Sequence, residues 1–390
     1  MDHDEAGGTP CPVCGGTDIV ETVRRDRLPV LQNYVYPTRE AALAAPHGRL
    51  VVAVCRDCAF AWNREFEPAR LVYEAGYDNT VPSAVMDVHY RETAAYLAQE
   101  HDLDGGLVVD IGCGNGAFLK TLCDEVPTAR GLGIDPALEE DWQSADGRVR
   151  LVRAAFAAEL IPQAPALVVC RHVLEHLPRP VEFLAEVRDG VGPAPCFFEV
   201  PDLRWILEHS AFQDFCYEHC NYFSAESLGE LLRRAGLAPA TTRMVFGSQY
   251  LAVEASAGGE VAEAPAGPAT AASVAAYAAR EADRIEGVAQ RLREAGRPVG
   301  VWGMATKGVI FSVLTDPQRS LIDLCLDINV NKQGAFVPLT GHMITSPNAL
   351  IDGFDRAPLL VVMNENYRDE IARTCQELGV EATLVSLDEI

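Results

Sequence analysis

The chain has 390 residues, of which 48% are hydrophobic and 23% charged, and its formal net charge at pH 7 is −24. This length exceeds the size at which one hydrophobic core stops growing, so two or three domains are expected. Because a strongly acidic protein repels phosphate backbones and anionic lipid surfaces, nucleic acid and membranes are excluded as expected partners.

The start of the chain, MDHDEAGGTPCPVC, has no basic segment followed by an apolar run, and no stretch approaches the roughly 18 uninterrupted apolar residues of a membrane span. We therefore expect a cytoplasmic protein. In that reducing compartment its twelve cysteines are interpreted as thiols, metal ligands or small core residues and not as a disulfide scaffold.

Two CxxC pairs lie in the first 80 residues, Cys11 with Cys14 and Cys55 with Cys58. Two intervening residues let a tight turn direct both sulfurs at one ion, and two such turns complete a tetrahedral zinc site. Four thiolates leave no open coordination position, so the zinc is expected to be structural. Two redox or incidental thiol pairs are the alternative. We predict a zinc-binding module over residues 1–80, with irregular, Pro-rich sequence between the pairs.

The next part of the chain alternates short apolar runs with amphipathic segments, which is typical of a doubly wound parallel sheet. We expect helices at residues 86–100 and from 117 to 124, and strands at 107–111, 130–134, 167–170 and 196–200. This pattern predicts a Rossmann-type α/β domain over residues 81–255.

A composition of small residues marks positions 255–273 as a linker. A long helix is expected at residues 274–295, and a second strand–turn–helix series begins at residue 299. The segments LIDLCLDIN and PLLVVMN supply further strands. Residues 256–390 are therefore predicted to form a second Rossmann-like α/β domain.

The strongest chemical signal is VVDIGCGNG at residues 108–116, where an apolar strand ends in a glycine-rich turn that opens a helix. Glycines let the backbone approach a ligand closely, and a helix N-terminus offers free N–H groups. Asp135 closes the next strand, where a carboxylate accepts ribose hydroxyls. A purely structural glycine turn with a capping Asp is the alternative. The turn resembles motif I of class I S-adenosylmethionine methyltransferases. The expected cofactor-binding residues are Asp110, Gly112, Gly114, Asn115, Gly116, Asp135, Phe156 and Arg171.

Ionisable groups are concentrated in two segments that follow strands. RHVLEH at residues 171–176 places His172 near the methionine end of the cofactor, while Glu175 and His176 could equally form a cap and surface pair. FQDFCYEHCNYFS at residues 212–224 crowds acid, base and aromatic side chains together, which suits general acid–base chemistry. We expect His219, oriented by Glu218, to be a base, with further roles for Tyr217, Asn221 and Tyr222.

The cysteine pairs, the glycine turn, an xYEHxxYFS segment and a WGxxxKG…DxNxxKQG segment occur in this order along the chain. Together they resemble the sugar C-methyltransferases of antibiotic deoxysugar pathways, of the mycarose, noviose and tetronitrose type. The resemblance implies S-adenosyl-L-methionine as cofactor and a role in secondary metabolism. It assigns the family's Glu-His pair to Glu218 and His219, and another family tyrosine to Tyr77. A further family tyrosine falls on Cys216.

The C-terminal domain carries polar residues after its strands, and the resemblance suggests that they touch a phosphate or nucleotide handle of the substrate. These residues are Lys307, Asn329, Lys332 and Asn364. A docking domain with merely conformational loops is the alternative. The protein is expected to be a monomer or a homodimer.

Three functions are compared. The first is C-methylation of a nucleotide-linked or carbonyl-activated small molecule, with His219 as base and Tyr217, Tyr77 or His172 stabilising the enolate. The second is methyl transfer to nitrogen or oxygen, for which the tyrosine missing at Cys216 would matter less. The third is a nicotinamide-dependent oxidoreductase or a nucleotide-sugar-binding module. The segment VWGMATKG argues against this third function, because it lacks the glycine spacing that binds a pyrophosphate.

Overall fold

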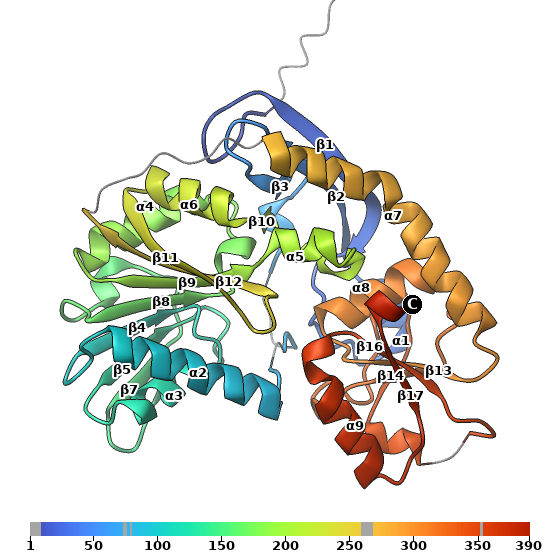
Figure 1. Cartoon of the computed structure of the whole chain (residues 1–390). Helices are drawn as coiled ribbons and strands as arrows, with labels where there is room; N and C mark the ends of the chain where they lie inside the picture. Colours follow the sequence, from blue (N-terminus) through green and yellow to red (C-terminus); the bar gives the residue numbers. More distant parts are fainter. Residues whose placement is uncertain (1–8, 73–75, 79, 259–267, 352–353) are drawn as a thin grey trace, which may run out of the picture.

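The computed structural model describes residues 9–72, 76–78, 80–258, 268–351 and 354–390. It contains a four-stranded sheet, an eight-stranded sheet and a five-stranded sheet. In Figure 1 the eight-stranded sheet and the five-stranded sheet stand on either side, and the four-stranded sheet with the long helix α7 bridges them at the top.

The N-terminal sheet is antiparallel and has the order β1-β2-β3-β10. Its elements are β1 (Ile19–Pro29), α1 (Arg39–Leu43), β2 (His47–Cys55), β3 (Ala61–Asn63) and β10 (Asn221–Tyr222). The expectation of irregular sequence between the cysteine pairs was therefore wrong. The apolar residues 50–54 of β2 are all buried, and α7 covers β1 and β2, so these strands form a core with a partner from far along the chain.

The eight-stranded sheet has the order β11-β12-β9-β8-β4-β5-β7-β6, and its five central strands are parallel. This confirms the predicted doubly wound sheet, and each expected strand lies within one residue of its position. The elements are α2 (Ala84–Glu100), β4 (Leu107–Ile111), α3 (Ala117–Glu125), β5 (Arg130–Ile134), β6 (Trp142–Gln143), β7 (Val149–Val152), β8 (Leu167–Arg171), α4 (Pro180–Val191), β9 (Cys196–Pro201), α5 (Leu203–Glu208), α6 (Ala225–Arg234), β11 (Leu237–Val245) and β12 (Tyr250–Ala257).

The C-terminal sheet is entirely parallel and has the order β15-β14-β13-β16-β17, as expected for a second Rossmann-like unit. Its elements are α7 (Pro268–Glu294), β13 (Val299–Trp302), α8 (Thr306–Thr315), β14 (Leu324–Leu326), β15 (Ile344–Thr345), β16 (Leu359–Val362), α9 (Arg368–Glu377) and β17 (Thr383–Ser386). The expected linker is shorter than predicted, because residues 255–257 belong to β12 and residues 268–273 to α7, while residues 259–267 lie outside the described residues.

Short 3₁₀ turns complete the fold, and two of them, at residues 174–176 and 212–214, lie in the segments where site residues were predicted. They are η1 (Pro68–Arg70), η2 (Ala158–Leu160), η3 (Leu174–His176), η4 (Phe212–Asp214), η5 (Pro347–Leu350), η6 (Glu365–Tyr367) and η7 (Leu387–Glu389).

A buried ion pair ties the three parts together. Arg25 of β1 pairs with Glu281 of α7 and donates to the carbonyl oxygens of Phe212 and Phe215. Both charged side chains are less than a tenth exposed. Because β10 and this ion pair join segments on both sides of residue 80 and of residue 255, the domain limits at those residues stay predictions.

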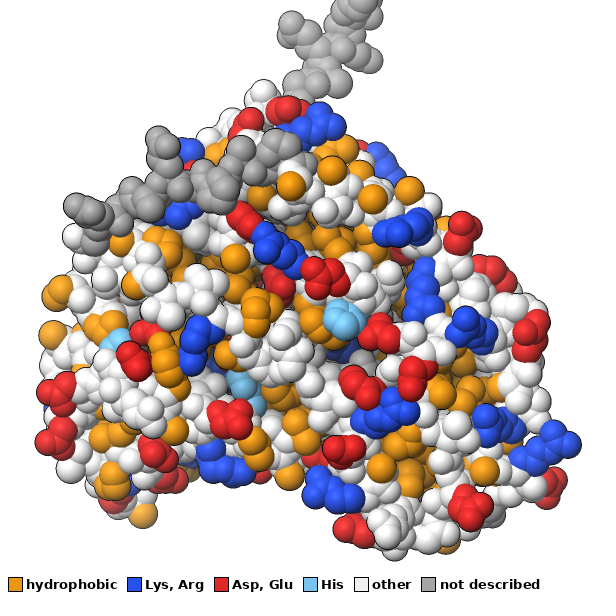
Figure 2. All heavy atoms as spheres, in the orientation of Figure 1, with side chains coloured by type: hydrophobic (Ala, Val, Ile, Leu, Met, Phe, Trp, Pro, Cys, Tyr) orange, Lys and Arg blue, Asp and Glu red, His pale blue; other side chains and the backbone are white. Residues whose placement is uncertain are grey.

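The surface carries acidic and basic side chains interspersed over the visible face, as Figure 2 shows. The negative charge is thus spread over this face and not gathered into one patch. No helix within the described ranges is long and apolar enough to cross a membrane.

Candidate active site

One cavity of about 590 Å³ is lined by all three parts of the molecule. The part built on the eight-stranded sheet contributes the turns after β4 and β8, and the C-terminal part contributes the turns after β13, β14 and β16. Asn33 and Tyr77 line it from the N-terminal module. Since ligands bind at the carboxyl ends of strands in open parallel sheets, each Rossmann-like unit presents its binding edge to the same space.

The glycine turn after β4 forms one wall of this cavity. Gly112, Gly114 and Gly116 have φ values of 73°, 53° and 75°, which only glycine adopts without strain. A side chain at position 112 would collide with Val173, whereas position 114 has open space beside it. Gly112, Gly114 and Asn115 line the cavity, while Gly116 caps α3 and packs against Leu151. The open backbone fits a ligand held at close range.

Asp135 and Phe156 lie outside the cavity lining. The carboxylate of Asp135 accepts the N–H groups of Gly114 at 2.8 Å and Ala137 at 2.7 Å, so it fixes the glycine turn. The ring of Phe156 packs edge-on against Phe183 at 6.0 Å. Contacts of either residue with adenosine stay predictions.

Asp110 is buried at the end of β4 and lines the cavity. Burial is the main cause that raises the pKa of its carboxyl to about 7, with Arg171 opposing the shift. Arg171 also lines the cavity, and its guanidinium lies over the ring of Phe118 at 4.3 Å. Arg171 is thus a buried cation in the floor of the site.

Glu199 of β9, which sequence reasoning missed, gathers these groups. Its carboxylate is fully buried and accepts hydrogen bonds from Arg171 at 2.8 Å and from His172 at 3.0 Å. The Nε2 atom of His89 lies 3.1 Å away on the other side. A carboxylate in an otherwise apolar strand was the available signal, because a buried charge requires partners.

His172 is held by two carboxylates. Its Nε2 faces Glu199, and its Nδ1 lies 3.4 Å from Glu175. The backbone carbonyl oxygen of Glu199 also accepts the backbone N–H of His172 at 2.8 Å, and His172 has a left-handed φ of 54°. Burial would lower the pKa of His172, but the hydrogen bonds to Glu175 and Glu199 outweigh it and raise the pKa to about 9. His172 is therefore an imidazolium near neutral pH.

Three expected site residues in the segment 217–222 point away from the cavity. The ring of Tyr217 fills the space beside Gly48, and its hydroxyl accepts the backbone N–H of Glu67 at 2.9 Å. Asn221 donates to two carbonyl oxygens of the 174–177 turn, and Tyr222 donates to a carbonyl oxygen at position 216. This corrects the expected roles in catalysis and substrate binding: all three stabilise the fold around the site.

Glu218 and Tyr77 do meet at the cavity. The hydroxyl of Tyr77 donates to Glu218 at 2.6 Å, and the His176 Nδ1 atom lies 3.9 Å from the same carboxylate oxygen. His176 also contacts the carbonyl oxygen of Glu218 at 3.1 Å. The expectation that Glu218 orients His219 is corrected, because its carboxylate is turned toward Tyr77 and His176.

His219 lines the cavity beside Glu175 and His176, and the potential ligand atoms of these three side chains lie within 4.8 Å of one another. Burial, followed by the nearby His176, lowers the pKa of His219 to about 3. Its imidazole is therefore neutral at physiological pH, which is the form that accepts a proton.

The C-terminal domain supplies positive charge to the opposite wall. The ammonium of Lys307 pairs with Asp214 at 2.8 Å, and that of Lys332 donates to Asn33 at 2.8 Å. Burial lowers the pKa of Lys332. Lys307, Lys332 and Asn364 line the cavity, with Asn364 bound to Gln249. Asn329 does not line it and instead donates to the Thr80 carbonyl.

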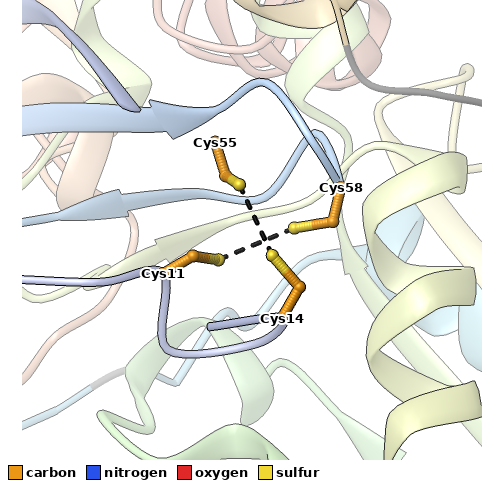
Figure 3. Close-up of side chains that lie close together, drawn as sticks. All are labelled: Cys11, Cys14, Cys55 and Cys58. Atoms are coloured by element: carbon orange, nitrogen blue, oxygen red, sulfur yellow. Dashed lines mark hydrogen bonds between the residues drawn. The ribbon is translucent and has the colours of Figure 1, made fainter. Parts of the chain in front are cut away.

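The four cysteines of the two CxxC pairs converge on one point, as Figure 3 shows. All their sulfurs lie within 4.8 Å of one another. The two knuckles match: Gly15 and Ala59 follow the second cysteine of each pair with φ values of 75° and 64°, and each donates its N–H to the carbonyl of the first cysteine. Two equivalent turns directed at one point fit a tetrahedral metal ion.

Comparison with known proteins finds two family models that match this chain. Residues 85–242 match the family described as "Methyltransferase domain", and residues 250–383 match "C-methyltransferase C-terminal domain". The chain is 29% identical to the C-methyltransferase NovU of Streptomyces niveus over 93% of this chain and 90% of that protein.

Two further relatives cover less of the chain. A trans-aconitate 2-methyltransferase of Sinorhizobium fredii is 30% identical over 39% of this chain and 59% of its own length. A solved 1,6-didemethyltoxoflavin-N1-methyltransferase of Burkholderia thailandensis, with bound S-adenosylhomocysteine, is 19% identical over 47% of this chain and 83% of that one, at a TM-score of 0.35.

The match along almost the full length of one C-methyltransferase, together with the two adjoining domain families, agrees with a glycine turn and a second Rossmann-like unit that share one cavity. The chain is an S-adenosylmethionine-dependent methyltransferase in which a match to a methyltransferase domain is followed by a match to a C-methyltransferase C-terminal domain.

Proposed function

We propose that this enzyme methylates a carbon next to a carbonyl group in a small molecule of secondary metabolism, and that the substrate is a nucleotide-linked ketosugar. The observation that carries the proposal is the shared cavity. It joins the glycine turn, the neutral His219 and the two lysines Lys307 and Lys332. A cofactor site, a base and a cationic wall are the three parts that such a reaction requires.

The cofactor, when bound at Gly112 and Gly114, supplies an electrophilic methyl group on a sulfonium. His219 takes the proton from the carbon beside the carbonyl, and the C–H electron pair moves into the carbonyl as an enolate. We assign stabilisation of that enolate to the hydroxyl of Tyr77 and to the charge of His172. Held at the glycine turn, the cofactor would present its methyl group to this enolate carbon.

The nucleotide handle is assigned to the C-terminal wall. The first turn of α8 and the ammonium groups of Lys307 and Lys332 face the cavity, and a diphosphate requires such N–H donors and cations. Asn33 accepts from Lys332 and donates to Thr306, so it holds this wall in place from the N-terminal module.

We also propose that Cys11, Cys14, Cys55 and Cys58 hold one structural zinc ion. The fit rests on the two matching knuckles and on the spacing of the four sulfurs. Because thiolates fill all four positions, this ion would stabilise the fold and take no part in the reaction.

The reaction is tested with a ¹³C-methyl-labelled donor and a thymidine diphosphate-linked 4-ketohexose. The expected product carries the label on carbon, seen by NMR; label on nitrogen or oxygen, or no product from several nucleotide-linked ketosugars, would contradict the assigned substrate class.

The base is tested with His219→Ala. We expect at least a hundredfold loss of turnover, in line with the typical 10²–10⁴-fold contribution of a general base. Calorimetric binding of S-adenosylhomocysteine should be unchanged, because the glycine turn is untouched. Full activity in this variant would remove His219 from the mechanism.

A further inference from the structure

Glu175 is a buried carboxylate with an unused oxygen beside the base. Its side chain is 2% exposed. One oxygen, Oε1, faces His172, while Oε2 is buried and has no hydrogen-bond partner within the described part of the chain. A buried carboxylate oxygen without a partner is costly, so its retention requires a reason.

The position of Glu175 supplies that reason. A carboxylate oxygen of Glu175 lies within 4.8 Å of a ring nitrogen of His219. Oε2 of Glu175 makes no hydrogen bond to His219 or to another described residue, but such bonds in ligand-free sites are often long and shorten when the substrate binds. The negative charge of Glu175 also favours the protonated form of His219, against the effect of burial.

A chain of hydrogen bonds and ion pairs fixes Glu175 in this place. His172 bridges Glu175 to Glu199, and Glu199 is held in turn by Arg171 and His89. The carboxylate therefore cannot swing away to solvent without breaking contacts that lie in the floor of the cavity. Its orientation is set before any substrate arrives.

Glu218, the sequence neighbour of the base, is oriented differently. Its Oε1 accepts from Tyr77, and its Oε2 faces the backbone N–H of Gln32 at 3.4 Å. The carboxylate that lies with the ring of His219 is therefore that of Glu175, from a distant turn, while the carboxylate of Glu218 is held by Tyr77 and Gln32.

We propose that Glu175 is the positioning residue of the base: it accepts the N–H of His219 and stabilises the imidazolium that forms when His219 takes the substrate proton. The proposal rests on the proposed function, in which His219 is the base. Glu175 itself touches neither the substrate nor the cofactor in this role; it acts through His219, as the carboxylate of a His-carboxylate pair does in other enzymes.

The test separates proton removal from methyl transfer. The enzyme is incubated in D₂O with S-adenosylhomocysteine and the thymidine diphosphate-linked 4-ketohexose, and deuterium uptake at the carbon beside the carbonyl is followed by NMR. For Glu175→Gln we expect uptake and kcat to fall by about 100-fold, while KM and the affinity for S-adenosylhomocysteine stay within about twofold of the unaltered enzyme.

The conservative variant Glu175→Asp should restore part of the lost rate, because it keeps the charge. Glu186→Gln, an exposed change on α4, is the matched control and should leave all values unchanged.

Each other outcome has a definite meaning. Unchanged uptake in Glu175→Gln, with uptake abolished in His219→Ala, would overturn the role of Glu175 and leave the proposed function intact. Equal uptake in His219→Ala and in the unaltered enzyme would instead remove the base of the proposed function. Loss of S-adenosylhomocysteine binding in Glu175→Gln, or no gain in Glu175→Asp, would show a purely structural role and overturn the proposal.

Discussion

At the residue scale, two histidines of one cavity are held in different charge states, one protonated and one neutral. Carboxylates at both ring nitrogens outweigh the effect of burial and leave His172 with a pKa of about 9, whereas burial and the neighbouring His176 leave His219 with a pKa of about 3. Separated pKa values of this kind divide the tasks of a site between a fixed cation and a proton acceptor.

The raised pKa of His172 predicts a pH-dependent contribution to stability. A folded-state pKa above the ordinary value of 6.5 gives stability that is fully present below pH 6.5 and is lost as the pH rises through 9. The side chain is one-third exposed, so we expect the advantage of the unaltered protein over His172→Gln to shrink by roughly 2 kcal/mol across that interval.

Urea unfolding at several pH values between 6.5 and 9 measures this difference. His47→Gln, at an exposed position at the start of β2, is the matched control. Curves that stay parallel for His172→Gln and the unaltered protein would contradict the charge assigned to His172.

Single residues also mark the limit of what the sequence could predict. The segment 217–222 contained every residue type that catalysis needs, yet only Glu218 and His219 line the cavity. Which side chains of an irregular segment face a ligand depends on packing against distant residues, here Gly48 and the 174–177 turn. The pairing of Glu199 with Arg171 could not be predicted for the same reason, because the two residues lie on neighbouring strands that are far apart in sequence.

At the scale of elements, the turn after β4 shows how backbone conformation makes a binding site. Gly112 and Gly114 both have positive φ, but only position 112 has a side chain, that of Val173, in the way of an added methyl group. The two glycines therefore differ in one respect and can be compared directly.

We expect Gly112→Ala to lose binding of S-adenosylhomocysteine by more than tenfold and to lower the free energy of unfolding by about 2–3 kcal/mol, from strain and overpacking together. Gly114→Ala should cost only about 1–2 kcal/mol of backbone strain. Calorimetry and urea unfolding of both variants check this. Equal losses in the two would show that the contact with Val173 is unimportant.

Elements were predictable where the pattern was simple. The parallel strands of both Rossmann-like units were found because continuous apolar runs bounded by turn residues leave little choice. β1 and β2 were missed because β1 (IVETVRRDRLP) carries charged residues that alternate irregularly and has two breaks in its register with β2. β10 could not be predicted, because it has only two residues and its partner strand β3 lies far away in the sequence.

At the scale of the whole molecule, the N-terminal module is a structural support of the cavity. Asn33 and Tyr77 reach the site from this module. The two cysteine knuckles hold one end of the N-terminal sheet, and the positions of Asn33 and Tyr77 depend on that sheet. The order of the motifs could be predicted from the sequence, but the meeting of three units around one cavity could not, because it is set by surfaces and not by local patterns.

Removal of the metal should therefore reduce activity from a distance. We expect Cys55→Ser to bind no zinc by elemental analysis, to melt at a lower temperature, and to lose turnover while still binding S-adenosylhomocysteine. Cys375→Ser, a buried cysteine of α9, is the control and should retain zinc. Bound zinc at full occupancy in Cys55→Ser would contradict the four-thiolate site.

The pairing of β3 with β10 has a consequence for biosynthesis. As the nascent chain leaves the ribosome, β1, β2 and β3 emerge early, but the edge of β3 stays open until Asn221 and Tyr222 have also been made. All four cysteines of the proposed zinc site lie ahead of β10 in the chain, so an ion can bind there before this pairing forms. In this order of synthesis the proposed zinc ion would be the first constraint on the sheet and β10 the last, and the edge of β3 is open to aggregation until β10 pairs with it.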